Sequence, residues 1–330
     1  MKDKYFKVRY SQLSPISLQE EIIRRYHFEH PTCRFYDSGM NDIYLVKNGD
    51  DTLYLRISQT GMHELVDYEE EVDIINTLYE NGITVAVPIK CADESYIWDI
   101  NAPEGIRYAV LFEEAKKSPS EDKVKSIYNL GKMIARMHEI SDDKDFKVSR
   151  SPIDLNQLMK QPLDRIKYYL EHRQDDYKYL SESSEKLSKY IEQKLKKEQP
   201  IYGFCHGDIH SGNIFFEENE PMIFDFDCMG YGWRAYDICV FAWNESYENE
   251  HYCYSEEWKA FMDGYNSVRQ LSESERDTIN AFIALRQLWL MGLHADVMER
   301  NAGCCWYNDA YFDEQIRIFK IWYQRTFNNL

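Results

Sequence analysis

Three side chains with oxygen ligands, Asp208, Asn213 and Asp225, stand at spacings that suit the transfer of a phosphoryl group. Asp208 and Asn213 are five positions apart in the segment HGDIHSGN, so one tight loop can point both side chains inward. Asp225 comes twelve positions after Asn213, at the end of the apolar run 221–224, which predicts a buried strand. The run 213–216 predicts the strand before it, with a polar turn between the two.

Phosphoryl transfer requires a protein mainly to orient the attacking hydroxyl and to neutralise the phosphate charge with Mg²⁺. A carboxylate can accept a hydrogen bond from that hydroxyl, which is the catalytic role that we predict for Asp208. Mg²⁺ prefers oxygen ligands in octahedral geometry, and Asn213 and Asp225 would supply two of them. The pattern His-x-Asp-x-x-x-x-Asn is that of kinase catalytic loops, although Gly207 stands where protein kinases have Arg. The structural alternative is a turn in which Asp and Asn only bond to the backbone.

The segments HGDIHSGNIFF and PMIFDFDCMGYGWRAYDICVF resemble those of the aminoglycoside phosphotransferase/choline kinase superfamily. In detail they are similar to its bacterial branch, which includes the stress-response kinase and homoserine-kinase-II-like proteins. The resemblance covers most of the chain and is strongest at 204–238. It implies an α+β, two-lobed protein-kinase-like fold, with a small N-terminal lobe of antiparallel sheet plus helix and a larger, mainly helical C-terminal lobe. It also implies an ATP- or GTP-dependent kinase that uses Mg²⁺.

On this resemblance, residues 1–112 form the nucleotide-binding lobe and residues 113–330 form the catalytic and substrate-binding lobe. The segment 141–200 is rich in Lys, Glu, Asp and Tyr and has helical patterns near 155–171 and 177–197. We expect an inserted helical subdomain there, where this superfamily often builds its substrate-specific wall.

A β-hairpin is predicted near the N-terminus, because two apolar runs, 43–47 and 52–57, flank the turn sequence Asn48-Gly49-Asp50-Asp51. Alternation places Leu53, Leu55 and Ile57 on one face of the second strand and Arg56 on the other face.

The family resemblance assigns Arg56 to the strand position that holds the nucleotide phosphates, where protein kinases have Lys. A guanidinium keeps the charge and can bind phosphate in a bidentate way, and Lys47 is the weaker alternative. A helix is predicted over 68–81, and Glu71 shares its apolar stripe. A buried carboxylate needs a cationic partner, so we predict that Glu71 pairs with Arg56. Glu69 and Glu70, which precede Glu71 in the same predicted helix, are the alternatives.

Two further nucleotide contacts follow from the resemblance. The segment 36–42 contains one glycine instead of the glycine-rich loop of protein kinases, and Ser38 and Asn41 would contact the β-phosphate from it. The apolar strand 108–113 leads into the hinge, where backbone groups at and just after Glu113 would contact adenine.

Several polar residues near the loop are predicted to support it or to contact substrate. The resemblance assigns Asp237 to bracing the loop, and His206 has a similar supporting role. Asp227 either helps the metal site or bonds loop amides. His210 could contact phosphate or substrate, with a purely structural histidine as the alternative.

The segment 280–300 predicts a buried helix, because it is apolar on most faces. Its polar side chains, including Arg286, therefore either pair internally or face the substrate. Aromatic rings beside carboxylates would suit an amine or ammonium substrate. On this basis the candidate substrate contacts are Trp243, Glu245, Tyr247, Trp289 and Asp296.

The composition limits the partners. Lys+Arg 39 against Asp+Glu 57 gives a formal charge of −18, which disfavours nucleic acid and anionic membranes and mildly favours a cationic substrate. The eight cysteines include no C-x-x-C pair, the start of the chain is charged, and no long apolar run occurs, so we expect a cytoplasmic protein without a signal peptide. We expect a monomer or homodimer.

These observations predict a kinase whose acceptor is a hydroxyl of a small molecule, such as an amino alcohol, an aminoglycoside-like antibiotic or a natural-product intermediate. One alternative is a stress-response-type Ser/Thr protein kinase. Another is a regulatory protein that binds nucleotide without catalysis. A metal-dependent hydrolase that uses the same carboxylates is a more distant one.

Overall fold

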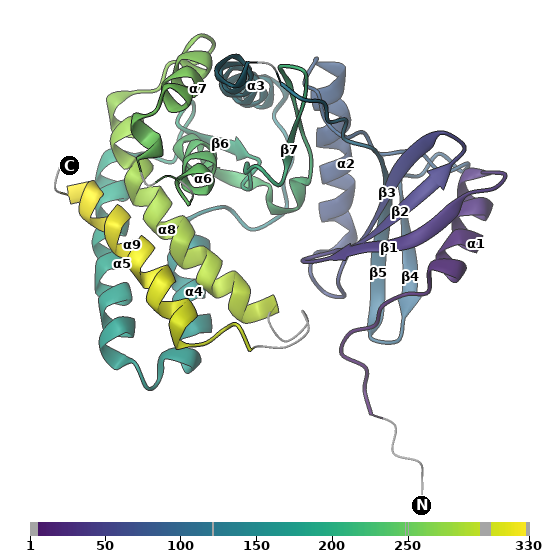
Figure 1. The fold of residues 1–330 in the computed structure, drawn as a ribbon, viewed down its shortest axis with the longest axis horizontal. Coiled ribbons are helices and arrows are strands. Elements are labelled where there is room, and N and C mark those ends of the chain that lie inside the picture. The colour runs from purple at the N-terminus through teal and green to yellow at the C-terminus, as the bar shows by residue number, and fades with distance from the viewer. Residues whose placement is uncertain (1–5, 121, 248, 250, 298–304, 328–330) are drawn as a thin grey trace, which may run out of the picture. The chain divides into compact units, whose positions relative to one another are not determined.

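The structure is a computed structural model that describes residues 6–120, 122–247, 249, 251–297 and 305–327. The chain divides into two compact units. The first comprises Met1–Tyr79 and Val85–Ala115, and the second comprises Glu80–Thr84 and Lys116–Leu330. The first unit is built on an antiparallel sheet and the second is mainly helical (Figure 1), which confirms the predicted α+β class.

The first unit contains a five-stranded antiparallel sheet in the order β1-β2-β3-β5-β4 (Figure 1). The predicted hairpin is present as β2 and β3, and Gly49 adopts the left-handed φ of 60° that its turn needs. The strands are β1 (Thr32–Ser38), β2 (Asp42–Asn48), β3 (Asp51–Ile57), β4 (Ile97–Ala102) and β5 (Gly105–Glu113).

The two faces of this sheet have different neighbours because side chains alternate along β3. Leu53, Leu55 and Ile57 share an apolar core with residues of helix α1 (Pro15–Tyr26). Arg56 points to the other face, where it meets helix α2 (Leu65–Glu80). The alternation predicted for this strand is therefore present, and it places one cationic side chain against a helix.

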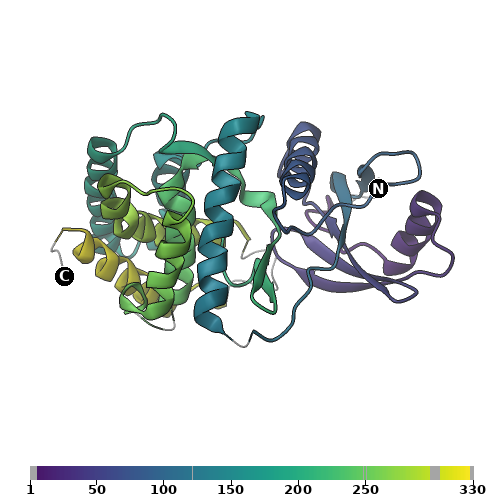
Figure 2. The same cartoon turned by 90° about the horizontal axis from the view of Figure 1, so that it is seen from above.

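The second unit is organised around the long helix α8. This helix packs on α4, α5, α6 and α9, while α3 packs on α7. Figure 2 shows α3 from the side, along its full length. The helices are α3 (Lys123–Lys144), α4 (Gln161–Ile166), α5 (Gln174–Lys194), α6 (Arg234–Ser246), α7 (Glu256–Asn266), α8 (Glu273–Val297) and α9 (Asp309–Phe327).

Helix α8 is buried on most of its faces, as its apolar composition predicted. It begins at Glu273, earlier than the expected start at residue 280, and the expected positions 298–300 lie outside the described residues. In the segment 141–200, the second predicted helix corresponds to α5, but the first is divided. A π-helical turn at Asn156–Lys160 comes before α4, which has Pro162 in its first turn, where the missing N–H is tolerated.

In the second unit, two small two-stranded sheets lie on either side of the loop 206–213 in the chain. β6 (Tyr202–Cys205) pairs with β9 (Gly230–Trp233), and β7 (Ile214–Glu217) pairs with β8 (Glu220–Ile223). Residues 206–213 connect β6 to β7. Across the described part of the chain, no helix is both long and apolar enough to cross a lipid bilayer.

Candidate active site

The loop after β6 turns sharply at Gly207, whose φ is +81°. A Cβ atom at this position would lie 2.3 Å from the carbonyl oxygen of Cys228, and real Cβ atoms do not approach backbone so closely. Only glycine combines this φ with this approach. Gly207 stands where protein kinases have Arg, and this loop conformation leaves no room there for a larger side chain.

Asp237, on α6, holds the start of the loop by accepting two backbone hydrogen bonds. The N–H groups of His206 and Gly207 donate to its two carboxylate oxygens at 2.8 and 2.7 Å. Burial raises the pKa of Asp237 to about 6, although both amide bonds oppose this change. The carboxylate thus makes the contacts expected of a loop-bracing residue.

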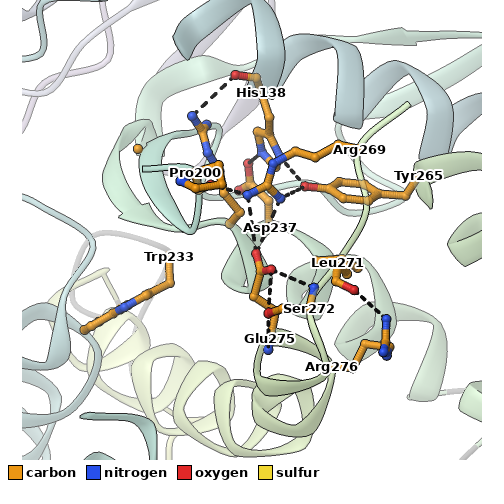
Figure 3. Close-up of polar contacts among 12 residues, drawn as sticks. His138, Pro200, Trp233, Asp237, Tyr265, Arg269, Leu271, Ser272, Glu275 and Arg276 are labelled. Carbon is orange, nitrogen blue, oxygen red and sulfur yellow. Dashed lines mark hydrogen bonds and ion pairs between the residues drawn. The ribbon is translucent and has the colours of Figure 1, made fainter. Parts of the chain in front are cut away.

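A chain of buried hydrogen bonds continues behind Asp237 (Figure 3). Arg269 donates to the Tyr265 hydroxyl, which leaves that hydroxyl free to donate to His138 Nδ1 at 2.8 Å. His138 Nε2–H then donates to Asp237 at 3.0 Å. Burial, with the charges of Arg234 and Arg269, lowers the pKa of His138 well below its usual range, so the imidazole is neutral.

His206 links the loop to the end of β8. The N–H of Asp208 donates to His206 Nδ1 at 3.2 Å, so the proton is on Nε2, which donates to the Phe224 carbonyl oxygen at 3.2 Å. These contacts agree with a supporting position.

Asp208 is the carboxylate of the loop 206–213, and three side chains contact it. Arg286 donates to its Oδ1, while Asn213 Nδ2 and His210 Nε2 lie 3.1 and 3.3 Å from its Oδ2. Burial alone would raise the pKa of Asp208, but the Arg286 charge and the hydrogen bond and charge of His210 hold that pKa well below its usual range. A carboxylate in this state accepts hydrogen bonds well and retains a proton poorly.

Asn213 and Asp225 lie at the same end of the β7–β8 hairpin. Ile214 pairs with Ile223, and the N–H of Phe224 donates to the Asn213 carbonyl oxygen at 3.1 Å, so Asp225 follows directly. Asp225 has a left-handed φ of 64°, a conformation that aspartate adopts more readily than most non-glycine residues. An amide oxygen and a carboxylate are hard oxygen donors, so this pair fits a divalent cation such as Mg²⁺. Nearby, Asp227 is buried and its carbonyl oxygen accepts from Arg150 at 2.7 Å.

Arg286 contacts the candidate catalytic residue Asp208, although the sequence did not place it at the site. Besides Asp208 it contacts the Tyr236 hydroxyl at 3.2 Å, and its guanidinium carbon lies 4.9 and 4.0 Å from the ring centres of Trp243 and Trp289. The signal was an arginine in the segment 280–300, which is apolar on most faces. Its partner is 78 positions away and could not be identified from sequence spacing.

The predicted substrate contacts are distributed over several elements of the second unit. Trp289 is occupied on one face by Arg286, and the side chain of His210 is 29% exposed beside Asp208. Glu245 is half-buried on α6, and Asp296 forms a partly exposed ion pair with Arg165 at 2.9 Å. Substrate binding by these four residues remains a prediction.

In the first unit, Arg56 and Glu71 form a buried ion pair of 2.7 Å, with Glu71 fully inaccessible. Of the three neighbouring glutamates considered, this identifies Glu71 as the partner. Arg56 also lies over the ring of Phe112, 5.1 Å from its centre. The predicted contact of Arg56 with nucleotide phosphates remains a prediction.

The turn before β2 is held by a buried cluster that the sequence did not indicate. Ser38 donates to the Asp42 carboxylate at 2.8 Å, and Asp42 forms an ion pair of 2.7 Å with Arg107, in which neither side chain is accessible. Asn41 in the same turn is also buried. At the end of β5, the N–H of Glu113 is already used by the Val87 carbonyl oxygen at 2.9 Å, so its carbonyl group or the following residues remain for the predicted adenine contact.

A small unit with an antiparallel sheet comes first in the chain. A helical unit follows, with Asp208 and Asn213 on one loop and Asp225 after the next hairpin. Together these features define the class of kinase-like phosphotransferases. Residues 32–301 match the Phosphotransferase enzyme family. The chain belongs to this family and is a small-molecule kinase, which confirms the resemblance drawn from the loop sequence.

The chain is similar to known kinases in sequence and in fold. The amicoumacin kinase of Bacillus subtilis (strain 168) is 25% identical over 294 residues, which cover 85% of each chain. The structure of amicoumacin kinase hAmiN, solved with AMP-PNP, Ca²⁺ and Ami, superposes with a TM-score of 0.75 at 23% identity, covering 96% of this chain and 95% of that one. A microcompartment-associated aminopropanol kinase gives a TM-score of 0.71 at 18% identity, with coverage of 94% and 96%.

Proposed function

We propose that this protein transfers the γ-phosphoryl group of ATP or GTP, with Mg²⁺, to a hydroxyl group of a small cationic molecule. The observation that carries the proposal is the set of hydrogen bonds that the Asp208 carboxylate accepts. Arg286 donates to its Oδ1, and Asn213 Nδ2 donates to its Oδ2 at 3.1 Å. The N–H of Phe224, the residue before Asp225, donates to the Asn213 carbonyl oxygen across the β7–β8 hairpin.

Each residue has a distinct part in this reaction. Asp208 accepts a hydrogen bond from the acceptor hydroxyl and orients it for attack on the phosphorus. The pKa of Asp208 is held below its usual range, which keeps the carboxylate ionised at neutral pH and able to accept this hydrogen bond. Asn213 and Asp225 hold Mg²⁺, which neutralises charge on the phosphate oxygens when bound. Arg56, kept in place by Glu71, binds the nucleotide phosphates.

Two observations support a cationic acceptor. The formal charge of −18 attracts cations to the protein and repels polyanions. The names of two relatives specify amicoumacin and aminopropanol as their substrates, an antibiotic and an amino alcohol. We therefore expect an amino alcohol, an aminoglycoside-like antibiotic or a related natural-product intermediate.

A coupled ADP- and GDP-release assay tests this proposal. Purified protein is mixed with Mg·ATP or Mg·GTP and a panel of amino alcohols, choline-like amines, aminoglycosides, neutral polyols and a generic protein substrate. We expect release to be stimulated by one class of cationic hydroxyl compounds. Stimulation by the protein substrate alone would instead support a protein kinase, and release that no acceptor alters would support a hydrolase. Nucleotide binding without any release would support a regulatory protein.

A further inference from the structure

The guanidinium of Arg286 is buried among residues of the second unit. Its side chain is 3% exposed, and its guanidinium lies against the rings of Trp243, on α6, and of Trp289, one turn further along α8. Guanidinium planes stack well on indole rings, and the stack restricts the rotation of the group. The arginine is therefore oriented before any substrate arrives.

The donors of this guanidinium reach two consecutive residues of the loop. Nη2 donates to Asp208 Oδ1, while Nη1 lies 3.4 Å from the Gly207 carbonyl oxygen and 3.2 Å from the Tyr236 hydroxyl. A planar fork can hold a backbone carbonyl and a carboxylate at once, whereas the single ammonium of lysine cannot reproduce the two directions.

We propose that Arg286 is the positioning residue for Asp208. Arg286 fixes Oδ1 and Asn213 fixes Oδ2, so the plane of the carboxylate cannot turn. His210 Nε2 also lies 3.3 Å from Oδ2. This inference rests on the proposed function, because it concerns the orientation of the hydroxyl that Asp208 receives.

Chemical rescue separates this role from a merely structural one. Arg286→Ala leaves a space beside two indole rings that suits a small guanidinium. We expect its kcat to fall by about 100-fold, the cost of a displaced catalytic group, with the KM for ATP changed by less than about twofold. Methylguanidinium should restore a large part of kcat, while methylammonium, which has the same charge, should not. Arg286→Lys should remain close to the alanine variant, because a single ammonium cannot make both contacts.

The matched control is Arg276→Ala on the same helix, where the lost side chain donates to the Leu271 carbonyl oxygen and not to the loop. Its kcat should stay at the wild-type value with or without methylguanidinium. Nucleotide-induced thermal shifts verify that each variant is folded, and Arg286→Lys serves as the test if the alanine variant is not.

The outcomes are distinct. The inference is overturned if Arg286→Lys has wild-type kcat, or if methylguanidinium fails to raise the kcat of folded Arg286→Ala. It is also overturned if Arg286→Ala has the same kcat as Arg276→Ala. If the wild-type protein itself transfers phosphate to no acceptor, the proposed function fails, and this inference fails with it.

Discussion

The backbone N–H of Gly207 donates to the Asp237 carboxylate at 2.7 Å, across 30 positions of the chain. The same carboxylate accepts from the neighbouring amide of His206 and from the neutral imidazole of His138. One side chain on α6 therefore connects the start of the loop to α3. Because the loop also carries Asp208, the position of the proposed catalytic carboxylate depends on this buried contact.

Asp237→Asn should change the pH dependence of stability. The native pKa of Asp237, about 6, is above the ordinary value of 3.8, so the native state binds this proton more tightly than the unfolded chain. The stabilisation from this proton is fully present below about pH 4 and is lost as the pH rises through about 6, a change of about 3 kcal/mol. Above about pH 7 the contribution should be constant.

The measurement is urea unfolding of the wild type and Asp237→Asn at several pH values. Six of the seven tryptophans lie in the second unit, so their fluorescence reports mainly on its unfolding. The difference in unfolding free energy, wild type minus variant, should decrease between pH 4 and 6. A difference that does not vary with pH would show that the carboxylate titrates normally.

Gly207→Ala should damage the loop. The added methyl group meets the Cys228 carbonyl oxygen at a φ that alanine rarely adopts. We expect a loss of roughly 2–4 kcal/mol in stability together with a large loss of kcat. The matched control is Gly82→Ala, since Gly82 has nearly the same φ of +82° but meets only the flexible end of Arg136, at 3.4 Å.

Backbone strain alone should cost Gly82→Ala about 1 kcal/mol and leave kcat intact. Thermal unfolding and steady-state kinetics of both variants compare the two positions. Equal losses of stability and kcat in the two variants would show that the close approach of the added Cβ to the Cys228 carbonyl oxygen has no effect.

Asp225→Asn should weaken metal-dependent nucleotide binding and leave the fold unchanged. Asparagine has nearly the same size and tolerates the left-handed backbone of Asp225, so only the charge is lost. We expect the affinity for Mg·ATP to fall by at least about tenfold, or about 1.4 kcal/mol. Calorimetric titrations with ATP in the presence of Mg²⁺ and in the presence of a chelator measure the change. An unaltered response to Mg²⁺ would remove Asp225 from the metal site.

Variants of the Arg56–Glu71 ion pair can separate the effect of Arg56 on stability from its effect on nucleotide binding. Arg56→Met leaves the Glu71 carboxylate buried without its ion-pair partner at 2.7 Å and should cost roughly 3–5 kcal/mol. Adding Glu71→Leu removes the isolated charge and should restore most of that stability. The double variant should still bind ATP at least about tenfold more weakly than the wild type. Unfolding curves and ATP titrations are the measurements, and wild-type affinity in the double variant would rule out a phosphate contact by Arg56.

Local features of the fold were accessible from the sequence. The Asn-Gly turn between two alternating runs specifies the β2–β3 hairpin, because the turn type and the strand twist depend on adjacent residues. The pairing of Glu71 with Arg56 followed from helical periodicity, which placed one acidic side chain on a buried stripe. The loop residues Asp208 and Asn213 could be paired because both lie within a single turn.

Long-range contacts were not accessible in this way. Asp42 is separated from Arg107 by 65 positions, and Asp208 from Arg286 by 78, so no periodicity relates them. The four-residue strands β6 and β9 pair only because the chain returns to them after the loop. Such contacts depend on tertiary packing, which overrides local preference in short segments. The sequence could therefore indicate the candidate catalytic loop and, through the family resemblance, the contacting residue Asp237, but not Arg286.

The most direct test of the account is the transfer of γ-labelled phosphate from ATP to the small molecule that stimulates nucleotide release. Wild-type protein and Asp208→Asn are compared with the same acceptor and Mg²⁺, and the product is identified by mass spectrometry. The wild type should yield a phosphate monoester of the acceptor. Asp208→Asn should bind Mg·ATP with similar affinity and yield at least about 100-fold less product. Near wild-type transfer by Asp208→Asn, or label found only in inorganic phosphate, would contradict the assignment of Asp208 as the residue that orients the acceptor hydroxyl.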